Sequence, residues 1–216
     1  MGGDADGDVI SGFENLRGSA FDDVLSGDAV ANAINGGLGN DTVSGDGGND
    51  VLDGGASTAA LPGANDTVDY SYLVAGQNLT LALGALTAAT GAVAQTTTSG
   101  IAGDVDTVSN FENITGGAGN DRLTGNAGVT ILQGGDGDNR IQGGAGADIL
   151  SGGSNTAAGD TVSYAASISG VIVDLSLATA RSVPAATPMA MSCRASSTSS
   201  ARLWPIVSPA MPATTS

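Results

Sequence analysis

The sequence contains no histidine and no lysine, and all six of its basic residues are arginine. Without histidine, the chain cannot form zinc-protease motifs, Ser-His-Asp triads or histidine acid/base pairs. A pair of carboxylates could still catalyse hydrolysis, but the repeat described below accounts for nearly every acidic residue. We therefore expect no enzymatic active site within these 216 residues.

Aromatic residues and cysteine are also scarce. Aromatics make up 3% of the sequence, so its core must be thin and aliphatic. The single cysteine, Cys193, excludes an intrachain disulfide. The 22 acidic residues, all of them Asp except Glu14 and Glu112, give a formal net charge of −16. Such a surface repels nucleic acid and anionic membranes and attracts cations.

A long uncharged stretch, residues 71–103, raises the question of a membrane span. It is rich in Thr, Gly and Ala, and its counterpart near residues 171–177 carries Asp174, so we predict strands and no membrane span. Alternating aliphatic residues support this prediction in both places: Leu79, Leu81 and Leu83, and Val171, Val173, Leu175 and Leu177. The acidic, glycine-rich start lacks the basic and apolar regions of a cleavable signal peptide.

Glycine recurs every nine residues from Gly18 to Gly54 and again from Gly116 to Gly152. The unit that starts at Gly36 reads G-G-L-G-N-D-T-V-S and fits G-G-x-G-x-D-x-U-x, where U is a large aliphatic residue. This pattern is typical of a calcium-binding parallel β-helix. The eighth place is expected to point inward, and it is aliphatic in all eight uninterrupted units: Leu25, Ile34, Val43, Leu52, Leu123, Leu132, Ile141 and Leu150. A disordered low-complexity chain would not keep this register.

Each unit combines a turn of six residues with a strand of three. Glycines at the first, second and fourth places permit backbone conformations closed to other residues and let carbonyl groups converge. The Asp at the sixth place adds a hard anionic oxygen, the ligand type that calcium prefers. The glycine runs also resemble phosphate-binding loops, but there is no Lys and no helix pattern after them.

These repeats resemble the RTX family, the hemolysin-type calcium-binding repeat proteins secreted by Gram-negative bacteria, over about residues 7–180. The resemblance implies an all-β fold, a right-handed parallel β-roll in which two nonapeptides complete one coil. Each calcium ion would lie between two stacked turns, bound by carboxylates and glycine carbonyls. The implied ligands are Asp23, Asn32, Gly36, Gly37, Gly39, Asp41, Gly45, Gly48, Asp50, Asp66, Gly116, Gly117, Gly119, Asp121, Gly134, Gly135, Gly137, Asn139, Gly143, Gly144, Gly146, Asp148 and Asp160.

The resemblance also implies that turns two units apart lie on the same side of the roll. The sixth-place residues would then form four rows: Asp23, Asp41 and Asp66; Asn32 and Asp50; Asp121, Asn139 and Asp160; and Thr130 and Asp148. Asn and Thr supply neutral oxygens, which lowers the ligand charge and the affinity for calcium. We expect the row of three Asp to bind best and the row with Thr130 to bind worst.

A larger repeat surrounds the nonapeptides, because Phe13-Glu14-Asn15-Leu16 recurs 98 residues later as Phe111-Glu112-Asn113-Ile114. We predict a first module over residues 1–103, with nonapeptides over 18–70 and connector strands over 71–103. A second module would cover residues 104–180, with nonapeptides over 116–164 and a connector strand over 165–180. The connectors are expected to pack against the ends of each roll.

Residues 181–216 contain no Gly, Asp or Glu but five of the six Pro residues, which predicts a disordered low-complexity tail. If the gene is GC-rich, a shift of one base over residues 184–191 makes the coding sequence repeat residues 2–9. We therefore interpret the tail as a third module translated out of frame.

The family resemblance also implies a cellular context. The chain would stay unfolded during export through a type I secretion apparatus and would fold on calcium outside the cell. The parent would be a toxin, adhesin or surface protein with neighbouring RTX modules, which the repeated module favours. The alternative is an accessory module of a secreted protease, lipase or polysaccharide epimerase. The family's C-terminal secretion signal is not recognisable in this tail.

Overall fold

The computed structural model describes residues 5–55, 66–84, 95–96, 99–155, 158–175 and 192–194. The strands before residue 100 are β1 (Asn15–Arg17), β2 (Val24–Ser26), β3 (Ala33–Asn35), β4 (Thr42–Ser44), β5 (Val51–Asp53), β6 (Thr67–Asp69), β7 (Thr80–Ala82) and β8 (Gln95–Thr96). The later strands are β9 (Thr107–Ser109), β10 (Asn113–Thr115), β11 (Arg122–Thr124), β12 (Ile131–Gln133), β13 (Arg140–Gln142), β14 (Ile149–Ser151), β15 (Thr161–Val162) and β16 (Ser192–Arg194). Among the described residues there is no helix that could cross a membrane.

The three-residue strands occupy the seventh to ninth places of each nonapeptide. In β4 the central residue, Val43, is fully buried, while Thr42 and Ser44 are half-buried, as the alternation of side chains along a strand requires. Val43 pairs with Leu25 on one side and with Val68 on the other, so aliphatic residues stack directly on one another. The predicted inward position of the eighth place is confirmed for the buried residues Ile34, Val43, Leu52, Leu123, Leu132, Ile141 and Leu150.

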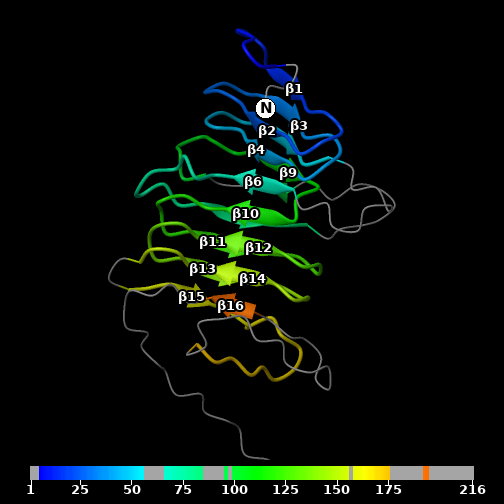
Figure 1. Cartoon of the computed structure of the whole chain (residues 1–216). Coiled ribbons are helices and arrows are strands. Elements are labelled where there is room, and N and C mark those ends of the chain that lie inside the picture. The colour runs from blue at the N-terminus through cyan, green and yellow to red at the C-terminus, as the bar shows by residue number, and fades with distance from the viewer. Residues whose placement is uncertain are drawn as a thin grey trace, which may run out of the picture.

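The strands form three sheets, and successive nonapeptide strands alternate between opposite sheets. The first sheet has the order β1-β3-β5-β9-β8, the second β2-β4-β6-β10-β12-β14-β16, and the third β7-β11-β13-β15. All pairs are parallel except β8 with β9. The strands are stacked along one axis from the N-terminal end towards β16 (Figure 1). The predicted all-β parallel β-roll is therefore confirmed.

The second sheet runs without a break through both predicted modules. β6, the last nonapeptide strand of the first module, pairs directly with β10, and Val68 lies opposite Ile114. The segment before residue 103 also contributes a strand of its own, since β7 pairs with β11 and buries Leu81 opposite Leu123. β7 is thus part of a sheet instead of a connector packed on the end of the roll.

The expected connector strand over residues 165–180 is wrong for the part that the structure describes. Residues 165–175 contain no strand, and Val171, Val173 and Leu175 are 41–48% exposed. They follow β15, which lies at the edge of the third sheet, and no described strand pairs with β15 on its far side. In the tail, the structure describes only β16, which pairs in parallel with β14; the rest of the predicted disordered tail lies outside the described residues.

Candidate calcium-binding turns

The sixth-place residues stack in two columns, one on each side of the roll. Column one precedes the strands of the second sheet and consists of Asp23, Asp41, Asp66, Glu112, Thr130 and Asp148. Column two precedes β3, β5, β9, β11, β13 and β15 of the first and third sheets and consists of Asn32, Asp50, Asp106, Asp121, Asn139 and Asp160; Leu79 takes the corresponding place before β7. The four rows expected from the sequence lie within these columns, and Thr130 and Asp148 continue the column that starts with Asp23.

A repeated hydrogen bond joins neighbouring residues within each of the four rows. In column one, the Oδ1 atom of Asp41 accepts the backbone N–H of Asp23 at 2.9 Å, and Asp66 Oδ1 accepts that of Asp41 at 2.8 Å. In column two, Asp50 Oδ1 accepts the N–H of Asn32 at 2.9 Å. One oxygen of each of these carboxylates is therefore committed to the preceding turn on the same side.

The second module repeats this arrangement with weaker acceptors. Asn139 Oδ1 accepts the N–H of Asp121 at 2.8 Å, and Asp160 Oδ1 accepts that of Asn139 at 2.8 Å. Asp148 Oδ1 accepts both the N–H of Thr130 at 3.0 Å and its hydroxyl at 2.9 Å. Neutral Asn139 thus occupies the place of Asp41 in the first module, and Thr130 occupies the place of Asn32, in the positions expected from the sequence.

The second carboxylate oxygen of several column residues is buried and has no hydrogen-bond partner. This applies to Oδ2 of Asp41, Asp50 and Asp148, which are at most 1% exposed. Burial raises the pKa of Asp41 and Asp148 above the ordinary value and that of Asp50 to about 6. A buried carboxylate with a free lone pair is stabilised by a cation or a proton.

Backbone carbonyl oxygens meet sixth-place carboxylate oxygens at the first glycine of several turns. A side chain at Gly116 would collide with Asp121 Oδ2, which accepts the N–H of Gly117 at 3.0 Å, and would lie 2.5 Å from the carbonyl oxygen of Gly134. At Gly36 the same space is taken by Asp41 Oδ2 and the carbonyl oxygen of Gly54. Only glycine leaves room for this convergence of oxygens, and carboxylate and carbonyl oxygens are the ligands that calcium prefers.

The second and fourth glycines close the turns. Gly37 and Gly39 have φ angles of +111° and +131°, which residues with side chains rarely adopt. The other predicted ligands with positive φ are Gly48, Gly135, Gly137, Gly144 and Gly146. Gly117 and Gly119 are not among the positive-φ glycines; they allow close contact with Leu73 and Gln77 instead. The first-place carbonyls of Gly45 and Gly143 lie against Gly27 and Gly125 in the same manner as those of Gly54 and Gly134.

Two column residues were missed by the sequence analysis. Asp106 Oδ1 accepts the N–H of Asp50 at 2.9 Å, and Glu112 Oε2 accepts that of Asp66 at 2.9 Å. Burial raises the pKa of Asp66 and of Glu112 to about 7. The available signal was the D-T-V triplet at Asp106, which is the same as at Asp41 and Asp66 but lacks the nine-residue glycine spacing.

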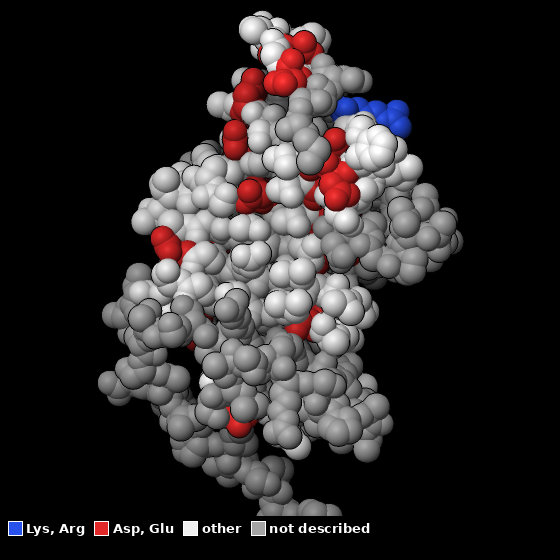
Figure 2. All heavy atoms as spheres, viewed as in Figure 1, with Lys and Arg blue, Asp and Glu red and all other residues white. Residues whose placement is uncertain are grey.

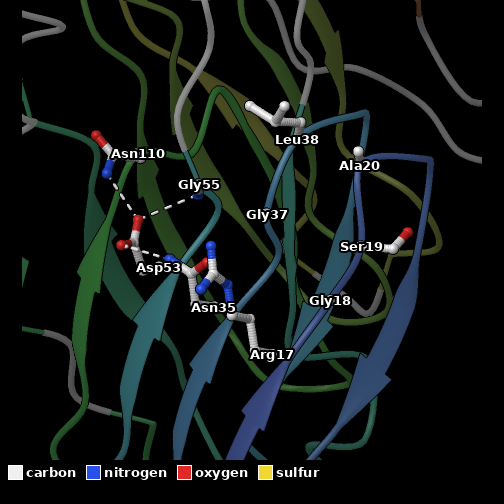
Figure 3. A pocket seen from close by; sticks show the side chains of 10 residues that line it. All are labelled: Arg17, Gly18, Ser19, Ala20, Asn35, Gly37, Leu38, Asp53, Gly55 and Asn110. Carbon is white, nitrogen blue, oxygen red and sulfur yellow. Dashed lines mark hydrogen bonds between the residues drawn. The ribbon is translucent and has the colours of Figure 1, made fainter.

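A shallow pocket of about 550 Å³ lies beside the first turns of column one. Its lining residues are Arg17, Gly18, Ser19, Ala20, Asn35, Gly37, Leu38, Asp53, Gly55 and Asn110 (Figure 3). Asp53 accepts hydrogen bonds from the side-chain amides of Asn35 at 2.8 Å and Asn110 at 2.6 Å. These contacts tie ninth-place residues together on the outside of the turns, away from the converging oxygens.

The surface charge agrees with a site for cations. In the view of Figure 2, acidic side chains are spread over the described surface and basic ones occupy a single small area. Within the described residues, no three Asp, Glu, His or Cys side chains converge as a ready-made metal cage.

Comparison with known families identifies the repeats. The RTX calcium-binding nonapeptide repeat matches the chain in four copies, over residues 3–29, 26–57, 108–129 and 125–156. No curated protein matches the chain. The repeats of this family bind calcium and are structural modules. Residues 3–57 and 108–156 of the chain thus consist of RTX calcium-binding nonapeptide repeats.

Proposed function

We propose that this chain is a module that folds when it binds calcium. The observation that carries the proposal is the set of buried, unpartnered carboxylate oxygens beside converging carbonyls. Asp41 with the turns of Gly36 and Gly54 is such a set. A divalent cation supplies the positive charge that these carboxylates lack and connects two stacked turns.

The rows of sixth-place residues would differ in their affinity for calcium. In column one, Asp23, Asp41 and Asp66 offer three carboxylates in succession, so we expect the tightest binding there. Between Thr130 and Asp148 only one carboxylate is present, so binding there is the weakest. The glycine carbonyls of the turns complete the set of oxygen ligands.

The balance of charge makes folding depend on the ion. All 22 acidic residues lie within residues 1–180, against Arg17, Arg122 and Arg140. In the absence of calcium the stacked carboxylates repel one another, and a core of short aliphatic strands is too small to offset the conformational entropy of the chain. The free energy of calcium binding then becomes free energy of folding.

We further propose that the module belongs to a larger secreted bacterial protein, a toxin, adhesin or surface protein with neighbouring RTX modules. Extracellular calcium modules work at about 10⁻⁴ to 10⁻³ M calcium, well above cytosolic levels. The chain would therefore remain unfolded inside the cell, pass a type I secretion apparatus and fold outside. The module itself would carry no enzymatic activity. The continuous pairing of β6 with β10 supports this assignment, because modules of this kind can be joined end to end.

Circular dichroism of the chain with and without millimolar calcium tests the proposal. We expect β structure to appear cooperatively on addition of calcium and to disappear with chelator, while magnesium at the same concentration has little effect. A matched variant, Asp41→Asn/Asp66→Asn, keeps the shape of two ligands but removes their charge, and should need more calcium to fold. Calcium-independent β structure in the natural chain would refute the proposal.

A further inference from the structure

Column two departs from the nonapeptide pattern at the turn before β9. This turn covers residues 99–106 and carries two buried acidic residues, Asp104 and Asp106, whereas no described nonapeptide turn buries more than the one at its sixth place. Asp104 is 5% exposed and Asp106 is fully buried. The segment lies outside the residues that match the RTX repeat.

Hydrogen bonds hold Asp106 in place. Its Oδ1 atom accepts the N–H of Asp50 at 2.9 Å, and its Oδ2 atom accepts the hydroxyl of Tyr70 at 2.8 Å. The carboxyl group of Asp104 contacts that of Asp106, and Asp104 Oδ2 accepts the hydroxyl of Ser99 at 2.7 Å. Asp106 and Ser99 thus position Asp104 against the turn that contains Asp50.

Three oxygens at this turn are buried and have no hydrogen-bond partner. They are Asp50 Oδ2, Asp104 Oδ1 and the hydroxyl oxygen of Tyr72. Burial and the neighbouring negative charges of Asp106, Asp104, Asp46 and Asp50 raise the pKa of Tyr72, so its hydroxyl stays neutral. Two buried carboxylates and a neutral hydroxyl, each with a free lone pair, are an oxygen-ligand set for a hard divalent cation.

The oxygen set differs from that of the nonapeptide turns. At Gly27 and Gly36, the space of the missing side chain is taken by a sixth-place oxygen and by a carbonyl from the next turn on the same side. At Gly45 the three nearest atoms all belong to Asp50, and no carbonyl of the following turn is among them. Asp104 supplies an additional carboxylate whose charge acts on Asp50.

We propose that Asp50, Asp104 and Tyr72 bind a calcium ion at this junction, a site outside the nonapeptide pattern. The ion would tie the turn before β9 to the turn before β5 and so hold together the region where the two predicted modules meet. The site rests on the proposed function only in that the roll must fold in calcium. Its ligands are distinct from the glycine carbonyls that define the repeated sites.

Terbium luminescence tests this site in the full chain. Tb³⁺ replaces Ca²⁺ at oxygen sites and emits when it is excited through a nearby tyrosine, and Tyr70 and Tyr72 have ring centroids only 5.9 Å apart. The background variant is Tyr164→Phe/Trp204→Phe, which removes the other tyrosine and the single Trp. In this background we expect tyrosine-sensitised emission that calcium displaces. Asp104→Asn should weaken the binding that gives this emission about tenfold, because it removes one anionic ligand.

Asp46→Asn is the matched control. Like Asp104→Asn, it removes one negative charge that acts on Tyr72. Asp46 is not among the proposed ligands, and its Oδ1 already accepts the hydroxyl of Ser44 at 3.1 Å. We expect its emission to stay within about twofold of the background. Equal terbium binding in the Asp104→Asn and Asp46→Asn variants would overturn the site, and so would a background variant that folds on calcium without sensitised emission. In that case the proposed function would still stand, because folding is measured separately by circular dichroism.

If Asp104→Asn does not fold in calcium, Tyr72→Phe provides the second test. It removes the hydroxyl ligand and keeps Tyr70 as the sensitiser. We expect weaker terbium binding than in the background variant, with unchanged calcium-induced β structure. Unchanged terbium binding in a folded Tyr72→Phe chain would also overturn the site.

Discussion

The segments 13–17 and 111–115 have nearly the same sequence but different surroundings. Phe13 is 69% exposed, whereas its counterpart Phe111 is 2% exposed. The strand in the first segment, β1, pairs only with β3, while the strand in the second, β10, lies between β6 and β12. Ile114 is therefore fully buried, and its counterpart Leu16 is only partly buried.

This difference shows that the repeat sets the direction of a side chain, whereas the neighbouring strands set how deeply it is buried. The F-E-N-aliphatic pattern determines which side chain points inward, and it does so in both copies. The burial of that side chain depends on the strands on either side of it. A rung at the end of a solenoid therefore contributes less to stability than the same rung in the middle.

The largest expected difference between the two copies is at the phenylalanine. Phe111→Ala should lower the free energy of unfolding in saturating calcium by about 3–5 kcal/mol, because it opens a cavity in the core. Phe13→Ala should change it by no more than about 0.5 kcal/mol, since the side chain is exposed. Chemical denaturation followed by circular dichroism measures both. Similar losses in the two variants would show that the N-terminal rung is covered in solution.

The second comparison concerns two residues of column one, Asp41 in the first module and Thr130 in the second. Asp41→Ala removes a buried anionic oxygen and the acceptor of the Asp23 N–H, whereas Thr130→Ala removes only a neutral hydroxyl that donates to Asp148. We expect Asp41→Ala to weaken calcium binding about tenfold, or about 1.4 kcal/mol, and Thr130→Ala about twofold. Calorimetric titration of the two variants against the natural chain measures the difference. Equal losses would contradict the ranking of the rows.

The repeat made the β-roll and the composition of the rows predictable from the sequence. The family resemblance places Asp23 and Asp41 in one column, because turns two nonapeptides apart stack on the same side, and Asp66 joins them when the insertion in the last unit is allowed for. Asp106 could not be found in this way, since its turn has a different length and only its contact with Asp50 reveals its place. The alternation at Val171 and Val173 predicted a strand that is absent, because alternation cannot tell whether a neighbouring strand edge is present.

The smallest expected effect is on pH dependence in the absence of calcium. Burial raises the pKa of Asp66 from 3.8 to about 7, so the folded chain holds a proton that the unfolded chain releases. This contribution is fully present below the unfolded pKa and is lost as the pH rises from about 4 to about 7. Lowering the pH from about 8 to about 5 in chelator should therefore stabilise the roll, by about 1 kcal/mol or a fivefold higher ratio of folded to unfolded chain.

Two Asp→Asn variants compare the modules in this respect. Asp66 lies between Asp41 and Glu112 and is 2% exposed, whereas Asp160 is half-buried at the end of column two. Burial raises the pKa of both carboxyl groups, and that of Asp66 reaches about 7. Asp66→Asn should therefore flatten the pH dependence of the circular dichroism signal more than Asp160→Asn does. An equal change in both variants would mean that the depth of a carboxylate in the stack does not control its proton binding.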